Sequence, residues 1–105
     1  MEYSEKILNR DFVLNNIKTL IKNEYPEIEH ISLFGSYARN TMGPLSDIDL
    51  IIEKPANIKP MKMWALSGDL MQLLKKPIDI MRLDDVDYNS EFYKDIEETK
   101  IDVFK

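Results

Sequence analysis

Two aspartates separated by one residue are the feature of this 105-residue chain best suited to chemistry. Asp47 and Asp49 lie in the segment SDIDLII, whose leucine and isoleucines predict a strand. Alternate side chains of a strand point to the same face, so the two aspartates share a face at a backbone separation of about 7 Å. Two like charges so placed favour a bound cation. Mg²⁺ prefers oxygen ligands and often arrives with the phosphates of a nucleotide.

A glycine and a serine end the apolar segment that precedes these acids. The segment HISLF, residues 30–34, has the composition of a buried strand and stops at Gly35-Ser36. Glycine lets the backbone approach a ligand closely, and serine can cap a helix whose first amide groups have no partners. A cluster of such amides favours phosphate. The turn therefore predicts a phosphate site.

A third aspartate, Asp79, interrupts the otherwise apolar segment PIDIM. A charge there is costly unless it is exposed, paired or coordinated. If this strand lies beside SDIDL, Asp79 converges with Asp47 and Asp49, and the three acids can hold two Mg²⁺ ions. Asp79 would then lie nearest the attacking oxygen and could accept its proton. The expected reaction is nucleotidyl transfer from a nucleoside triphosphate to a hydroxyl, with pyrophosphate leaving.

The remaining segments predict the elements that position these residues. Apolar residues recur at helical spacing over residues 4–24, and Pro26 ends that helix. Strands are predicted over residues 28–34 and 47–53, with a short helix at 37–41 between them. A second long helix starts at Pro60, a third strand covers residues 78–81, and a third helix covers 90–100. The final residues, IDVFK, give no clear pattern.

The apolar spacing of the second long helix predicts a core face made of Met63, Trp64, Leu70, Met71 and Leu74, with Leu66 and Leu73 flanking it. The following Lys75-Lys76 is interpreted as a solvated helix end, where positive charge suits the helix dipole. Together the elements predict an α+β (α/β-like) domain. Its sheet is small and mixed, with three to four strands, and its helices pack mainly on one face.

Size and charge limit the function. Residues 1–105 are expected to form a single domain. The formal net charge of −5 disfavours direct contact with nucleic acid, whose phosphates would be repelled. The chain has no cysteine, which suits a reducing compartment, and it contains neither a membrane-length apolar run nor a signal-peptide pattern. We therefore expect a cytoplasmic protein that does not bind membranes.

The segments GSYARN and SDIDL together resemble the GSxARGxxxxxSDIDL signature of the minimal nucleotidyltransferases (MNT) of the DNA polymerase beta superfamily, and the likeness covers most of the chain. The resemblance implies that Gly35 and Ser36 bind the triphosphate and that Asp47, Asp49 and Asp79 are metal ligands, with Asp79 the base. Arg39 of the motif either reaches a phosphate or faces solvent. Asn40 replaces the usual glycine, and asparagine tolerates left-handed dihedrals.

Family members this short commonly act as antitoxins, and the resemblance implies the same role here. Such an antitoxin uses Mg²⁺ and ATP to attach AMP to a tyrosine of a cognate HEPN-domain ribonuclease toxin, with which it would form a hetero-oligomer. A second hypothesis is a non-catalytic antitoxin that covers the active surface of its partner. A third, a free-standing enzyme acting on a small hydroxyl compound, is less attractive because nothing in the sequence supplies an acceptor pocket.

Overall fold

A four-stranded mixed sheet forms the centre of the computed structural model, which describes residues 2–104. The strands are β1 (His30–Phe34), β2 (Ile48–Lys54), β3 (Ile78–Arg82) and β4 (Ile101–Asp102). They lie in the order β3-β2-β1-β4. β1 is antiparallel to both β2 and β4, whereas β2 and β3 are parallel. The predicted α+β class with a small mixed sheet is confirmed.

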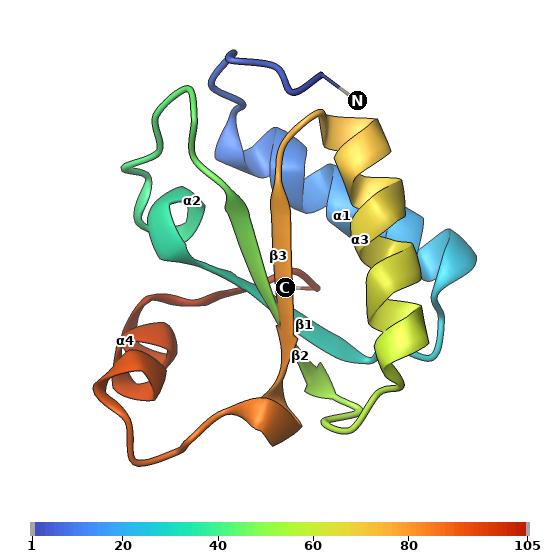
Figure 1. Cartoon of the computed structure of the whole chain (residues 1–105), viewed down its shortest axis with the longest axis vertical. Coiled ribbons are helices and arrows are strands. Elements are labelled where there is room, and N and C mark those ends of the chain that lie inside the picture. The colour runs from blue at the N-terminus through green and yellow to red at the C-terminus, as the bar shows by residue number, and fades with distance from the viewer. Residues whose placement is uncertain (1, 105) are drawn as a thin grey trace.

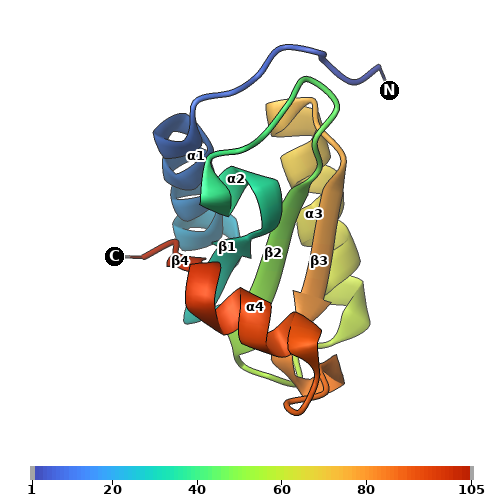
Figure 2. The same cartoon turned by 90° about the vertical axis from the view of Figure 1, so that its left-hand side faces the viewer.

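Helices lie on both faces of this sheet (Figures 1 and 2). α1 (Arg10–Glu24) and α3 (Pro60–Leu74) cover one face, and α2 (Gly35–Arg39) and α4 (Glu91–Thr99) lie on the other side. The main core contains buried side chains of both long helices, such as Ile17 and Leu70, packed with Leu50 of β2. A smaller cluster joins Ile96 of α4 to Phe34 and Ile51. The two long helices thus pack on one face as predicted, and α4 adds a smaller second layer.

α1 begins later than its apolar spacing predicts. The side chain of Asn9 accepts hydrogen bonds from the backbone N–H groups of Asp11 (2.8 Å) and Phe12 (3.3 Å), so Asn9 is the N-cap. Asparagine is favoured at this position because it satisfies amide groups that the helix leaves without partners. The preceding segment is not helical, and its Ser4 N–H donates to the backbone oxygen of Lys75 (2.8 Å).

The predicted core face of α3 is partly wrong. Leu70 and Leu74 are buried as predicted, and so is the flanking Leu66, whereas Trp64 is 71% exposed. The buried leucines recur at four-residue spacing, and a residue two positions from Leu66 points away from that line because the helix turns about 100° per residue. No helix within residues 2–104 combines the length and the apolar character needed to span a membrane.

Candidate active site

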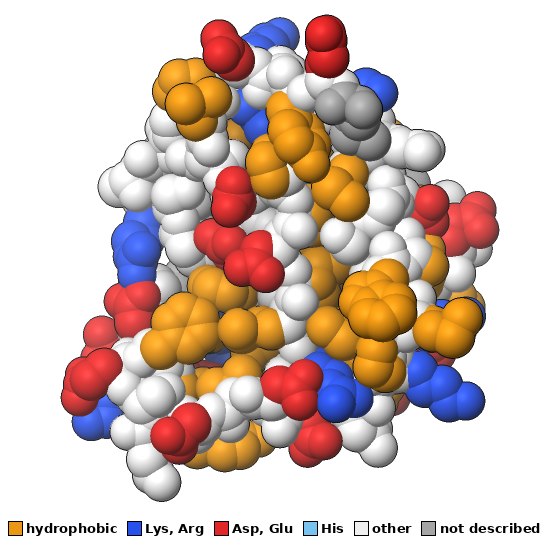
Figure 3. Space-filling view, in the orientation of Figure 1, with side chains coloured by type: hydrophobic (Ala, Val, Ile, Leu, Met, Phe, Trp, Pro, Cys, Tyr) orange, Lys and Arg blue, Asp and Glu red, His pale blue; other side chains and the backbone are white. Residues whose placement is uncertain are grey.

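The three predicted acids lie near one another at one end of the sheet. The parallel register of β2 and β3 pairs Asp49 with Asp79, and paired residues of neighbouring strands project from the same face. Asp47 lies two residues before Asp49, immediately ahead of β2. Figure 3, which faces the β3 edge of the sheet, shows a group of acidic side chains near the middle of this surface. The predicted adjacency of the DxD strand and the Asp79 strand is therefore correct.

The charges of Asp79 and Asp47 act on Asp49. Partial burial, followed by the charges of Asp79 and Asp47, raises the pKa of Asp49 from 3.8 to about 6. Within residues 2–104, none of the three carboxylates accepts a side-chain hydrogen bond or forms an ion pair. The site therefore concentrates negative charge, and no cation of the described residues pairs with it.

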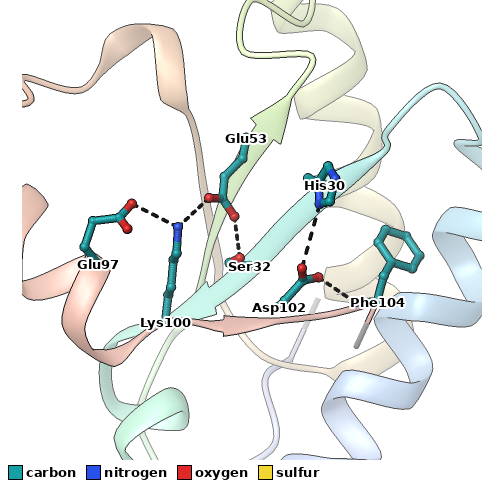
Figure 4. Close-up of polar contacts among 7 residues, drawn as sticks. All are labelled: His30, Ser32, Glu53, Glu97, Lys100, Asp102 and Phe104. Atoms are coloured by element: carbon teal, nitrogen blue, oxygen red, sulfur yellow. Dashed lines mark hydrogen bonds and ion pairs between the residues drawn. The ribbon is translucent and has the colours of Figure 1, made fainter.

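Glu53, also on β2, provides a contrast (Figure 4). Its side chain accepts hydrogen bonds from the Ser32 hydroxyl and from Nζ of Lys100 (2.6 Å), and Lys100 also donates to Glu97 (2.9 Å). Glu53 lies four residues after Asp49, so both side chains project from the same face of the strand. Glu53 at one end of β2 is thus neutralised by a lysine, whereas Asp49 near the other end, with Asp47 and Asp79 beside it, has no ion-pair partner within the described residues.

A cavity of about 1000 Å³ opens beside this paired network and not at the three acids. Several of its charged lining residues already have partners: Lys100 pairs with Glu53, Lys54 with Glu29, and His30 lies 3.7 Å from Asp102. The Lys100–Glu53 pair is partly buried, which is typical of a structural network, whereas the other two pairs are largely exposed ion pairs of the surface. We therefore place the candidate active site at the acids without partners.

Gly35 faces Asp49 directly. It has a φ of +72°, which side-chain-bearing residues rarely adopt, and a Cβ added to it would overlap Oδ2 of Asp49. Two separate requirements, left-handed backbone and close approach, therefore select glycine at this position. The turn predicted from Gly35-Ser36 is correct, and its backbone lies against the carboxylate of Asp49.

The rest of the motif forms the short helix α2. Asn40 ends it with a φ of 60°, so asparagine does adopt the left-handed conformation in place of the usual glycine. The backbone oxygen of Ser36 accepts from the Thr41 N–H (2.9 Å), while the Ser36 hydroxyl makes no hydrogen bond to the part of the chain that the structure describes. Arg39 contacts Asp95 of α4, so its predicted contact with phosphate would require it to leave that partner.

Comparison with known families decides the relationship of this chain. A family model described as Polymerase beta, Nucleotidyltransferase matches residues 15–105. The chain belongs to the polymerase beta nucleotidyltransferase family. A Methanocaldococcus jannaschii protein with the provisional name protein adenylyltransferase MJ0126 is 34% identical over 89 residues, which cover 85% of this chain and 89% of that protein. The protein adenylyltransferase MntA of Shewanella oneidensis is 30% identical over 69 residues, 66% of this chain and 50% of MntA.

Solved structures of toxin–antitoxin complexes share the fold of this nucleotidyltransferase. One is a toxin–antitoxin crystal structure with AMP-PNP, matched with a TM-score of 0.72 at 23% identity over 86% of this chain and 71% of that chain. Another contains a tri-AMPylated Shewanella oneidensis HEPN toxin with its MNT antitoxin, with a TM-score of 0.67, 20% identity, and coverage of 90% and 71%. At these identities the likeness establishes the fold alone.

The acids of this nucleotidyltransferase fit a divalent metal in donor chemistry. Asp49 and Asp79 are paired across neighbouring strands and Asp47 lies two residues before Asp49. The three carboxylates lack a protein cation within the described residues, and hard oxygen donors are the preferred ligands of Mg²⁺. The side chains do not, as they stand, form a ready-made group: no cluster of three acidic or histidine side chains within residues 2–104 is arranged to hold an ion. The metal roles of Asp47, Asp49 and Asp79 remain predictions.

Lys76 is a residue of the nucleotidyltransferase whose environment the sequence interpretation got wrong. It is not solvated: its side chain is 1% exposed, and Nζ donates to the backbone oxygens of Ser4 (2.7 Å) and Pro44 (2.9 Å). Lys75 adopts a left-handed conformation with φ 57°, which ends α3 and turns the next residue inward. Lys76 thereby links the N-terminal segment to the loop that leads into Asp47.

Replacing Lys76 with Met should lower the free energy of unfolding by about 1–3 kcal/mol, because two backbone oxygens lose their charged donor. The same change should loosen the loop before Asp47. Amide hydrogen exchange is expected to become faster around residues 4–8 and 43–46, with a lower melting temperature. Lys75→Met is the matched control, since Lys75 is exposed and its side chain forms no hydrogen bond to the described residues. Equal melting temperatures and equal exchange rates in the two variants would contradict the linking role of Lys76.

Proposed function

We propose that this chain is an antitoxin that transfers AMP from ATP to a tyrosine hydroxyl of a cognate HEPN ribonuclease toxin, using Mg²⁺, and thereby neutralises the toxin in the cytoplasm. The observation that carries this proposal is the pairing of Asp49 with Asp79 beside the Gly35 turn, with Asp47 just ahead of it. The names of the relatives, which include protein adenylyltransferases, support the same chemistry.

In the proposed reaction the tyrosine oxygen attacks the α-phosphorus of ATP. A new bond forms between these two atoms, the bond from the α-phosphorus to the bridging β-phosphate oxygen breaks, and pyrophosphate leaves. We assign the proton of the tyrosine hydroxyl to the carboxylate of Asp79, which is exposed on the edge strand β3. The backbone of Gly35 and the hydroxyl of Ser36 would hold the triphosphate.

Asp47, Asp49 and Asp79 would hold the metal, two ions by the family resemblance. When bound, Mg²⁺ would offset the negative charge of the phosphates and the leaving group. The protein itself holds these groups in place. The pairing of β2 with β3 sets Asp49 beside Asp79, and Gly35 leaves the space that the Asp49 carboxylate occupies. Such fixed placement is a major source of rate acceleration in phosphoryl transfer.

The first requirement is a reading frame for a HEPN protein next to that of this chain, and the test then uses α-labelled ATP, Mg²⁺ and that protein. We expect label on the toxin with the wild-type chain and none with the Asp47→Asn, Asp49→Asn double variant, which should also fail to restore growth of cells making the toxin. Asp11→Asn serves as the matched control, because Asp11 lies in the first turn of α1, away from the three acids, and should transfer label like the wild type.

The alternative, a non-catalytic antitoxin, predicts a different pair of results. The double variant would then neutralise the toxin fully, and the wild-type chain would leave no label on it. That combination would replace the enzymatic proposal with binding alone. Label that requires the wild-type acids, together with loss of neutralisation in the double variant, would exclude the alternative.

A further inference from the structure

The strand that carries Asp79 is an open edge of the sheet. Among residues 2–104, β3 pairs with β2 only, and it is the outermost strand in the order β3-β2-β1-β4. Figure 1 shows β3 as the foremost strand with no helix in front of it, and Figure 2 shows it along the border of the sheet with α3 behind. An edge of this kind presents backbone groups that another extended chain can pair with.

The register fixes which backbone groups of β3 face outward. The Ile48 N–H donates to the backbone oxygen of Pro77 (2.9 Å), and Ile48 is the register partner of Ile78. In a parallel pair the groups of alternate residues point to the same neighbour, so residues 77, 79 and 81 bond to β2. The N–H and C=O groups of residues 78, 80 and 82 therefore point away from the sheet.

The surroundings of this edge suit a basic, partly apolar segment. Met61 and Trp64 of α3 are exposed large hydrophobic side chains, as are Phe92 of α4 and Tyr88 in the loop before it. Figure 3 shows hydrophobic side chains on both sides of the β3 edge, with acidic groups among them. Beyond β3, the 3-10 helix η1 (Leu83–Asp85) adds two aspartates, of which Asp84 forms no ion pair within residues 2–104.

Resting on the proposed function, we propose that the acceptor tyrosine is delivered by strand addition. A basic, extended segment of the toxin pairs with the open edge of β3 and becomes a fifth strand of the sheet. The residue opposite Asp79 on that strand projects from the same face as Asp79 and Asp49, because cross-strand partners share a face. A tyrosine at that position points its hydroxyl along the face toward the three acids.

Amide hydrogen exchange tests this pairing residue by residue. The probe is the full-length HEPN protein, bound to the Asp47→Asn variant so that the complex does not turn over. We expect the amides of Ile80 and Arg82 to exchange fast in the free chain and slowly in the complex. The amides of Asp79 and Met81, which already bond to β2, should be slow in both states. Fast exchange at Ile80 and Arg82 in the complex would overturn strand addition.

A pair of variants tests the same contact by kinetics. Ile80→Pro removes the outward N–H and places a ring on the edge, a change that edge strands tolerate. Ile80→Ala is its matched control, since it also loses the isoleucine side chain but keeps the N–H. We expect Ile80→Pro to raise the KM for the toxin at least about ten-fold relative to Ile80→Ala, while both bind ATP alike. Equal KM values would count against the proposal.

The two proposals fail separately. Label on the toxin together with unchanged exchange at Ile80 and Arg82 would leave the AMP transfer standing and remove the strand addition. Slow exchange at these amides without any label would support docking at this edge and remove the enzymatic function. If no complex with the toxin forms, strand addition is overturned as well.

Discussion

Asp49→Asn is expected to stabilise the metal-free protein at pH 7 and to abolish AMP transfer. Folding raises the pKa of Asp49 from 3.8 to about 6, so the folded state holds the proton more tightly than the unfolded state. Stability contributed by this group is therefore present below pH 4 and is lost as the pH rises through 6. Asparagine does not ionise, so the variant keeps this stability at pH 7. After discounting for solvent screening, the gain is about 1–2 kcal/mol, or roughly 5–10 °C in melting temperature.

The dependence of the stability gain on pH and on Mg²⁺ distinguishes the raised pKa of Asp49 from other causes. The difference in melting temperature between Asp49→Asn and wild type should shrink as the pH falls and vanish at about pH 3, below the unfolded pKa of 3.8, where Asp49 is protonated in both states. Millimolar Mg²⁺ should raise the melting temperature of the wild type and not that of the variant. Asp84→Asn, at an exposed acid without an ion-pair partner in the described residues, is the control and should change neither quantity.

The rate of AMP transfer by Asp49→Asn should fall, although its stability rises. In the proposed reaction the metal would lose one ligand and with it several kcal/mol of charge stabilisation, so transfer to the toxin is expected to fall by about a thousand-fold or more. A variant that is more stable and inactive is the signature of acids kept together for function against their mutual repulsion. A variant of lower stability at pH 7 would show that Asp49 has a favourable partner in the fold, and would contradict the account given above.

Sequence reasoning identified the parts of this fold that depend on local pattern. The strand around SDIDL, the strand around Asp79 and the turn at Gly35-Ser36 were all predicted, because alternation and glycine placement are local properties. The adjacency of Asp49 and Asp79 was predicted because the family pattern places its third acid at Asp79 and because the two strands were expected to be neighbours in the sheet. These elements are the ones that hold the candidate site.

The features that were missed depend on tertiary contacts. β4 has two residues, too few for any periodic signal, and it exists because Ser32 and Leu33 pair with Asp102 and Ile101. Lys76 reads as a surface lysine until two distant backbone oxygens are brought to it. Arg39 likewise had no foreseeable partner, because Asp95 lies 56 positions away in the chain. Long-range pairing of this kind leaves no pattern in a single sequence.

Gly35→Ala should cause a loss of both stability and activity at the same site. A left-handed φ of +72° costs alanine about 1–2 kcal/mol, and the overlap of its Cβ with Oδ2 of Asp49 adds a penalty of about 1–3 kcal/mol. Displacement of Asp49 by as little as about 1 Å is expected to lower AMP transfer about a hundred-fold. Gly43→Ala is the matched control: its Cβ would meet nothing within 4 Å, and both properties should stay at wild-type values.

A double-mutant cycle separates the backbone penalty from the contact with Asp49. Truncating the carboxylate in Asp49→Ala removes the atom that the new Cβ would meet, so Gly35→Ala should cost less stability in that background than in the wild type. The remaining cost is the left-handed backbone alone, about 1–2 kcal/mol. Additive effects of the two substitutions on unfolding free energy would mean that Gly35 and Asp49 do not touch. In that case the close approach of the turn to the carboxylate, on which the geometry of the site depends, would be wrong.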